Sequence, residues 1–352
     1  MTGARDTSAR VSSPRMMAVT PARDAPPDLF DGPLVLRDPA AIADPVLRII
    51  AERTRALAAG MPLPADGATL ALGVEGGGMA TAMTCGMAWV LERLGATAAF
   101  DAVYGVSSGS IIAAHFAAGE MVGATQVFPA ACTRAFIDPR RALRGRAVLS
   151  LDVLFDLIRH HPIERALVRE RPDLRIVVAG VDDGRLRTLR GFASLDDLVL
   201  ALRAGCAIPV ISREVVSLHG ARLADGGLLE SVPFHTPLAE GVSHLLALRS
   251  RDATYRKGAR GRIYGLLEDR VINREPGLVP SMIRARPARY DADADALARA
   301  STGEGDLGGR VLQLAPAPGT PLVKRLQPDR ERVIAAMRAG ARVAADALCE
   351  PA

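Results

Sequence analysis

The sequence predicts a single α/β domain built on a mixed, mainly parallel sheet. Two consecutive strand–turn–helix units occupy residues 69–119, and each ends at a glycine. Later segments add hairpin turns between short apolar runs, and the chain ends in an amphipathic stretch. Repeated strand–turn–helix units are typical of parallel strands joined by crossover helices, whereas hairpins add antiparallel pairs.

The first unit begins with an apolar run at residues 69–74, which has the length of a buried strand. A glycine triplet at 76–78 follows and predicts a tight turn. Residues 80–94 then carry apolar side chains at helical spacing, and Gly95 is expected to end this helix.

The second unit repeats this order. Residues 102–104 predict a strand, Gly105-Val106-Ser107-Ser108-Gly109 a turn, and residues 110–118 a helix that stops at Gly119. Downstream, Asp182-Asp183-Gly184 and His219-Gly220 each separate two strand-like segments and predict hairpins. The other expected elements are three helices and two strands, the last strand at an edge: helices at 45–59, 194–204 and 329–348, and strands at 244–249 and 311–314.

Composition sets the boundaries of the domain. Residues 1–33 are rich in Ala, Arg, Pro, Ser and Asp, so we expect a disordered N-terminal tail followed by one domain over 34–352. Residues 251–308 are charged, punctuated by Gly and Pro, and weakly periodic. This segment is expected to form helical excursions or a less regular, lid-like insertion.

The overall composition is that of a soluble globular protein, with 49% hydrophobic and 24% charged residues. The net charge of +5 comes almost wholly from arginine, because Lys257 and Lys324 are the only lysines. Aromatic residues make up 4% and do not alternate with the basic runs, so no nucleic-acid partner is expected. The arginines of residues 134–146 suggest either a solvated face or contact with anionic headgroups.

Cysteine usage and hydropathy exclude other classes. The four cysteines are scattered without metal-ligand spacing, so neither a zinc site nor a disulfide framework is expected, and we expect no cofactor. The chain has no apolar run of membrane-spanning length and no apolar segment of a secretory signal at its start. We therefore expect a cytoplasmic protein that can contact the inner face of the membrane peripherally.

The second turn has the spacing of a nucleophile elbow. Gly105 and Gly109 lie two positions on either side of Ser107, where larger side chains would obstruct a tight strand-to-helix turn. The free N–H groups and the dipole of the following helix favour negative charge at its start. Ser107 is therefore the candidate nucleophile.

The glycine triplet is a candidate oxyanion hole. Gly76, Gly77 and Gly78 expose backbone N–H groups that side chains do not cover, and the Ser108 N–H is expected to join them. A dinucleotide-binding loop is an alternative, but its glycine spacing fails because Thr81 occupies the third position. A tight turn without chemistry remains a further alternative.

Asp225-Gly226-Gly227 ends a hairpin strand and supplies a candidate base. Aspartate followed by glycine is also common in plain turns, so a purely structural role is an alternative. A carboxylate with an ordinary pKa of about 3.9 is a weak base for a serine hydroxyl. Asp225 can serve only if it is shielded from water and hydrogen-bonded to Ser107, and Gly226 and Gly227 permit that close approach.

These three blocks, in this order, resemble the patatin-like phospholipase family. Ala207-Ile208-Pro209 and Asp225-Gly226-Gly227-Leu228-Leu229-Glu230 are similar to its bacterial members, and the resemblance covers roughly residues 65–350. It implies a three-layer α/β/α fold, a Ser–Asp dyad without histidine, and hydrolysis of the acyl esters of glycerolipids. By position, Ser107 becomes the nucleophile, Asp225 the proton acceptor, and the glycine block the oxyanion hole.

One position departs from the family pattern and keeps alternatives open. Where the family has a variable residue, Arg or Lys, and Gly, this sequence has Met79, Ala80 and Thr81. A non-catalytic patatin-like scaffold that binds lipid or a partner is therefore one alternative. A Ser–Asp–His esterase is the other, because His235 and His244 follow Asp225 in the chain.

Overall fold

A mixed sheet forms the centre of the molecule in the computed structural model, which describes residues 27–257, 272–301, 306–321 and 323–351. Its strands are β1 (Leu70–Val74), β2 (Ala102–Val106), β3 (Asp173–Gly180), β4 (Leu186–Leu189), β5 (Val216–Leu218), β6 (Ala221–Asp225), β7 (His244–Leu248) and β8 (Arg310–Leu314). Their order is β5-β6-β3-β2-β1-β7-β8, and β4 also pairs with β3.

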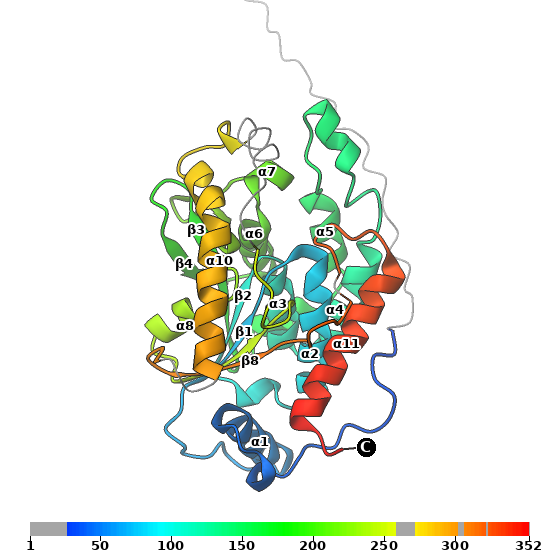
Figure 1. Cartoon of the computed structure of the whole chain (residues 1–352), viewed down its shortest axis with the longest axis vertical. Coiled ribbons are helices and arrows are strands. Elements are labelled where there is room, and N and C mark those ends of the chain that lie inside the picture. Colours follow the sequence, from blue (N-terminus) through cyan, green and yellow to red (C-terminus); the bar gives the residue numbers. More distant parts are fainter. Residues whose placement is uncertain (1–26, 258–271, 302–305, 322, 352) are drawn as a thin grey trace, which may run out of the picture.

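Helices cover both faces of this sheet (Figure 1). The α-helices are α1 (Pro45–Ala58), α2 (Ala82–Arg93), α3 (Ser108–Ala118), α4 (Met121–Ala130), α5 (Leu151–Ile158), α6 (Leu195–Cys206), α7 (Pro209–Ser212), α8 (His235–Ala239), α10 (Val279–Ser301) and α11 (Arg330–Leu348). The 3₁₀ turns used below are η2 (Gly78–Thr81), η4 (Pro139–Arg144) and η6 (Gly226–Leu228).

Strand directions match the expected mixed sheet. β1 pairs in parallel with β2 and β7, and the parallel arrangement extends to β3 on one side and β8 on the other. The hairpin strands β4 and β6 both pair antiparallel with β3, and β5 pairs antiparallel with β6. The prediction of a mixed, mainly parallel sheet within an α/β/α fold is confirmed, and β8 is an edge strand as expected.

Alternate residues of the central strands enter different cores on the two faces of the sheet. Leu70, Leu72 and Val74 of β1 point into the larger core, which α2, α4 and α11 cover, whereas Ala71 points into the smaller one. Helices α2 and α11 pack at close range through glycine, since a Cβ on Gly86 would lie 1.9 Å from a backbone oxygen of α11. This close contact holds α2, the helix that follows the glycine loop, against α11.

Helix α10 covers the opposite face (Figure 1). Its Tyr290 and Leu297 pack with Tyr104, Phe234 and Leu245 in the smaller core. Most of the described part of segment 251–308 is therefore regular helix rather than irregular insertion, because apolar positions along α10 complete this core. Residues 258–271 and 302–305 of the expected lid lie outside the described residues.

The packed body begins before the boundary that the sequence predicted. Leu29 is 2% exposed in the larger core, and Phe30 packs against the same core. The predicted tail at 1–33 therefore includes packed residues at its end, while residues 1–26 lie outside the described part of the chain. Within the described residues, no helix has both the length and the apolar character needed to cross a bilayer.

Candidate active site

The register of the sheet brings Ser107 and Asp225 to the same level. Val106, the last residue of β2, pairs with Val177 of β3. On the same edge of β3, just beyond the end of β2, the adjacent Val178 pairs with Asp225 at the end of β6, while β4 occupies the opposite edge. Because β6 runs antiparallel to β3, both strand ends deliver their polar residue to the same side of β3.

Ser107 occupies a strained turn between β2 and α3. Its backbone has φ 55° and ψ −136°, a conformation that side-chain-bearing residues rarely adopt, and it immediately precedes the first turn of α3. A Cβ on Gly105 would lie 2.4 Å from the Cα of Ser110, and a Cβ on Gly109 would lie 2.4 Å from the carbonyl oxygen of Val74. Both motif glycines are therefore required sterically, as the sequence predicted.

Asp225 is buried at the end of β6, with 2% of its surface exposed. Burial raises the pKa of its carboxyl, whereas the hydrogen bond with the Ser107 hydroxyl and the charge of Arg286 act in the opposite direction. The Gly227 N–H donates to Asp225 Oδ1 at 2.7 Å and fixes the carboxylate. Gly226 passes so close to β3 that a Cβ would lie 2.4 Å from a backbone oxygen of that strand.

The glycine loop after β1 lies directly beside the serine. A Cβ on Gly76 would come within 2.6 Å of the Cβ of Ser107, so only glycine permits this approach. However, the Gly76 N–H donates to the Ser231 carbonyl oxygen at 3.2 Å, and the Gly77 N–H donates to the Ser108 Oγ at 3.2 Å. Two of the four expected oxyanion donors are therefore already engaged, which corrects the expectation that all four are available.

The other two expected donors are the backbone N–H groups of Gly78 and Ser108. Within the described part of the chain, neither N–H has a protein acceptor. Gly78 begins η2, and Ser108 begins α3, so both N–H groups belong to helix starts that lack an earlier carbonyl to bind. These are the donors that remain for a developing oxyanion.

Thr81 explains part of the departure from the family pattern. Its hydroxyl is fully buried and shares a hydrogen bond of 2.6 Å with the Ser108 hydroxyl. This contact holds the Ser108 Oγ against the Gly77 N–H. Ala80 is likewise buried, with 2% of its surface exposed.

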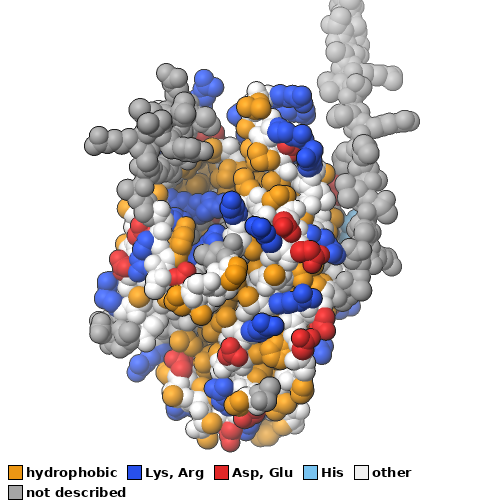
Figure 2. All heavy atoms as spheres, turned by 45° about the vertical axis from the view of Figure 1, so that its right-hand side comes forward, with side chains coloured by type: hydrophobic (Ala, Val, Ile, Leu, Met, Phe, Trp, Pro, Cys, Tyr) orange, Lys and Arg blue, Asp and Glu red, His pale blue; other side chains and the backbone are white. Residues whose placement is uncertain are grey.

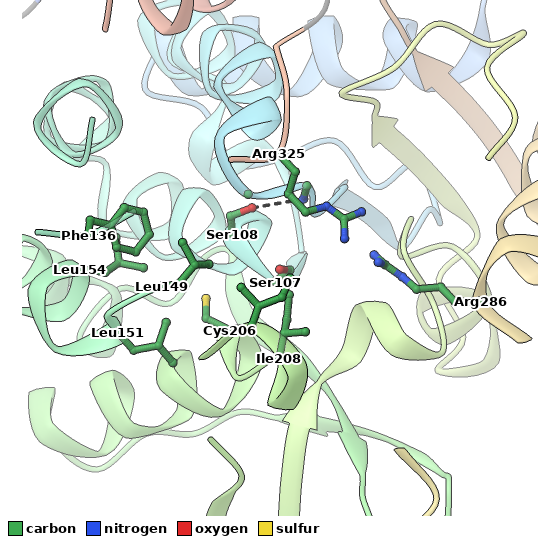
Figure 3. A pocket seen from close by; sticks show the side chains of 13 residues that line it. Ser107, Ser108, Phe136, Leu149, Leu151, Leu154, Cys206, Ile208, Arg286 and Arg325 are labelled. Carbon is green, nitrogen blue, oxygen red and sulfur yellow. Dashed lines mark hydrogen bonds between the residues drawn. The ribbon is translucent and has the colours of Figure 1, made fainter. Parts of the chain in front are cut away.

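A pocket opens at Ser107 and has two chemically different sides (Figure 3). Figure 3 shows Phe136, Leu149 and Leu154 on one side of Ser107, and the side chains of Arg286 and Arg325 on the other. The full lining is Gly77, Gly78, Ser107, Ser108, Phe136, Leu149, Leu151, Leu154, Cys206, Ile208, Ile211, Arg286 and Arg325. Burial raises the pKa of the Cys206 thiol well above its usual value, so this cysteine remains protonated.

An apolar hollow continues the pocket beneath α3 and α4. It shares Gly78, Ser108, Phe136, Leu149, Leu154 and Arg325 with the pocket at Ser107. Its further apolar lining consists of Met79, Ile111, Val127, Phe128, Ala131 and Ile137. Such a surface suits a hydrocarbon chain better than a polar substrate.

A buried polar cluster supports the glycine loop from the side of α10. Glu75 is 2% exposed, and Tyr290 donates to its Oε1 at 2.9 Å. The Ser250 N–H donates to Glu75 Oε2 at 2.5 Å, and Arg249 forms an ion pair with the same oxygen at 3.4 Å. Sequence reasoning missed this support, because nothing local in the sequence connects these residues.

The histidines do not form the alternative triad. His235 Nε2 lies 2.9 Å from Asp293 Oδ1, and its side chain is 56% exposed. His244 Nδ1 lies 3.0 Å from the Ser243 Oγ. Neither imidazole lines the pocket at Ser107, so the structure does not support the alternative Ser–Asp–His triad. Across the described ranges, no cluster of three or more His, Cys, Asp or Glu residues is placed to hold a metal ion.

Residues 72–238 match the family described as patatin-like phospholipase. The family match includes both Ser107 and Asp225. Among solved structures, the chain is similar to VipD from Legionella pneumophila at 12% identity and a TM-score of 0.34. That match covers 79% of this chain and 66% of the VipD chain, slightly less than two thirds of its length. No curated protein sequence matches this chain.

Proposed function

Because residues 72–238 of this chain match the patatin-like phospholipase family, we propose that it hydrolyses acyl esters of lipids through a Ser107–Asp225 dyad. The observation that carries the proposal is that Ser107, which follows β2, and the buried Asp225, which ends β6, meet on one edge of β3. A serine at an elbow and a water-shielded carboxylate are the two groups that an acyl transfer without histidine requires.

In the first step the Ser107 oxygen attacks the acyl carbon while its proton passes to Asp225. The N–H groups of Gly78 and Ser108 stabilise the oxyanion of the tetrahedral intermediate. Collapse of this intermediate breaks the ester bond, and the proton on Asp225 passes to the leaving alkoxide. An acyl-enzyme ester at Ser107 remains.

In the second step water attacks the acyl-enzyme. Asp225 takes a proton from the water, and the same N–H groups bind the second oxyanion. The proton returns to the Ser107 oxygen as the ester bond breaks, so the fatty acid leaves and the dyad is restored. No group beyond these residues and water enters this cycle.

The apolar side of the pocket supports a lipid acyl chain as the substrate group. Phe136, Leu149 and Leu154 lie next to Ser107 and continue into the hollow beneath α3 and α4. An acyl chain in this position would bury hydrocarbon at about 25 cal/mol per Å² removed from water. Its carbonyl end would then lie at the serine.

We propose that η4 is the membrane contact of this hydrolase. Leu143 in η4 is 89% exposed, and Arg144 and Arg146 beside it are exposed as well. Asp138 is the single acid in residues 134–146 and already pairs with Arg140. Figure 2 shows hydrophobic and basic side chains next to each other on the projecting segment at the top of the molecule. An exposed leucine among arginines suits a surface of anionic lipids.

A test of the dyad uses a fluorophosphonate probe and short-chain p-nitrophenyl esters. The wild-type protein should be labelled at Ser107 and should hydrolyse the ester at the same rate with and without EDTA. Ser107→Ala should abolish labelling and leave only residual hydrolysis. Ser110→Ala is the matched control, because the buried Ser110 hydroxyl has no hydrogen-bond partner among the described residues. A wild-type protein that neither reacts nor hydrolyses would instead be a non-catalytic scaffold.

A further inference from the structure

Two guanidinium groups face the candidate nucleophile from segments far apart in the sequence. Arg286 comes from α10, and Arg325 comes from the segment that precedes α11. Both line the pocket at Ser107. Figure 3 shows their side chains directed toward one another, on the side of Ser107 that lies opposite Phe136 and Leu154.

Neither guanidinium is neutralised by an ion pair within the described ranges of the chain. Arg286 donates to neutral oxygens only: its Nε bonds the Gly227 carbonyl at 2.5 Å, and its Nη2 bonds the Ser231 hydroxyl at 3.4 Å. The Arg325 guanidinium donates no hydrogen bond to any described residue, whereas its backbone carbonyl accepts the Met79 N–H at 2.9 Å. Donors of both side chains therefore remain available in the pocket.

The two cations disfavour one another. Burial and, next, the charge of Arg325 lower the pKa of Arg286 to about 10, and the opposing effects of Asp225 and Glu75 are smaller. Lys257 lies on the same side, with its Nζ 3.3 Å from the Ser231 hydroxyl. Burial first, and then Arg286 and Arg325, lower the pKa of Lys257 to about 6. Like charges at short range disfavour one another, and a further anion between them reduces this cost.

We propose that Arg286 and Arg325 form a subsite for a phosphate group carried by the acyl-ester substrate. The proposal rests on the hydrolase function and names its substrate class. A phosphate oxygen accepts charge-assisted hydrogen bonds from planar guanidinium groups, and two arginines on one side of a pocket can share its oxygens. Ser107 lies between this subsite and the apolar lining.

This arrangement also orients the substrate. An acyl chain in the apolar hollow places the ester at Ser107 and the alcohol part toward Arg286 and Arg325. A glycerol phosphate satisfies that geometry, because one glycerol carbon carries the acyl ester and another carries the phosphate. A neutral monoacylglycerol fills the apolar side equally well but leaves both guanidinium groups without an anion.

The decisive experiment compares two substrates that differ only in the phosphate: 1-oleoylglycerol 3-phosphate and 1-oleoylglycerol. For the wild-type protein, kcat/KM should be about tenfold or more higher for the phosphate ester, as expected for a hydrogen bond to a charged group. Arg325→Gln should remove most of this preference, expressed as the ratio of kcat/KM for the two substrates within the same variant. Arg325→Lys should retain part of the preference, because the charge remains.

Lys324→Gln is the matched control, because Lys324 is an exposed neighbour of Arg325 that does not line the pocket. It removes the same net charge and should leave the substrate preference unchanged. An equal kcat/KM for the two substrates, or a preference that Arg325→Gln leaves intact, would overturn the subsite. Loss of the preference in Lys324→Gln would also overturn the subsite. The net charge of the protein would then explain the preference without a specific contact between Arg325 and phosphate.

Inorganic phosphate separates a substrate subsite from a site for free phosphate. It should inhibit 1-oleoylglycerol hydrolysis competitively in the wild-type protein and more weakly in Arg325→Gln. Inhibition without any preference for the phosphate ester would assign the arginines to free phosphate and overturn the substrate proposal. Hydrolysis of 1-oleoylglycerol with fluorophosphonate labelling of Ser107 would still support the dyad, whereas loss of both would refute the hydrolase function itself.

Discussion

The hydroxyl groups of Thr81 and Ser108 are 2.6 Å apart, and this hydrogen bond decides how the glycine loop is used. Ser108 accepts the Gly77 N–H while it is held by Thr81. The Gly77 N–H is therefore engaged in a contact within the protein and is not available to a substrate. The Gly78 and Ser108 N–H groups are left for the substrate.

This relationship predicts that Ser108→Ala releases a donor. The variant removes the acceptor of the Gly77 N–H, so kcat for a p-nitrophenyl ester should rise several-fold, since one such donor is typically worth about 10²-fold or more in kcat. Thr81→Ser keeps the hydroxyl and is the matched control, with little expected change. A lower kcat in Ser108→Ala would mean that the Gly77 N–H does not face the oxyanion.

Replacing Asp225 should separate activity from stability. Asp225→Asn keeps the shape but cannot take the Ser107 proton, so kcat should fall on the order of 10³-fold or more. The pKa of Asp225 is raised in the folded protein, so its ionised form disfavours folding at neutral and higher pH. Below the unfolded pKa the carboxyl is protonated in both states, and this cost vanishes.

Thermal unfolding checks the stability half of that prediction. At pH 8 the Tm of Asp225→Asn should equal or exceed that of the wild-type protein, and the difference should shrink as the pH falls through the pKa of the folded Asp225. A Tm well below wild type at pH 8 would show that the ionised carboxylate stabilises the fold, contrary to the direction of its pKa shift.

The pH dependence of kcat should depend on Arg286. Asp225 must be ionised to act as the base, so activity should fall as the pH drops through its raised pKa. Arg286 lowers that pKa, and its loss in Arg286→Gln should move the acidic limb to higher pH. The measurement is a kcat profile with a neutral ester, and Lys324→Gln should leave the limb in place. An unmoved limb in Arg286→Gln would exclude Asp225 as the titrating base.

Membrane attachment should depend on Leu143. Leu143→Gln should reduce co-sedimentation with vesicles of phosphatidylglycerol and phosphatidylcholine, and added salt should weaken binding further, since each basic residue near such a surface contributes about 1 kcal/mol. Val168, which is 83% exposed outside η4, provides Val168→Gln as the matched control. Equal loss in both variants, or in neither, would exclude η4 as the contact.

The strands and the reactive turns were predictable because their signals are local. The run at Leu70–Val74 is apolar over its whole length, and the strand ending at Val106 leads into a glycine-flanked serine. The hairpin turn at His219-Gly220 likewise predicted a strand that ends next to Asp225, where β6 ends. Such features depend on neighbouring residues alone, and the structure places each close to its predicted boundary.

Other features depend on partners that the local sequence does not name. The regularity of α10 comes from the core that Tyr290 and Leu297 share with Phe234, and the individual residues of α10 give only weak periodicity. His235 followed Asp225 in the order that a triad requires, yet its ring bonds Asp293. Chain order does not reveal which side chains a fold brings together.

By itself the sequence determined the α/β class, the elbow at Ser107 and the aspartate at the end of its hairpin strand, because steric and hydrophobic patterns act over a few residues. Only the tertiary structure decided that β3 places Asp225 level with Val106, that Thr81 engages Ser108, and that Arg286 and Arg325 face one pocket. Arginine is abundant throughout this chain, so these two could not be distinguished from solvated ones by sequence. Their role follows from burial and proximity, and both are properties of the assembled fold.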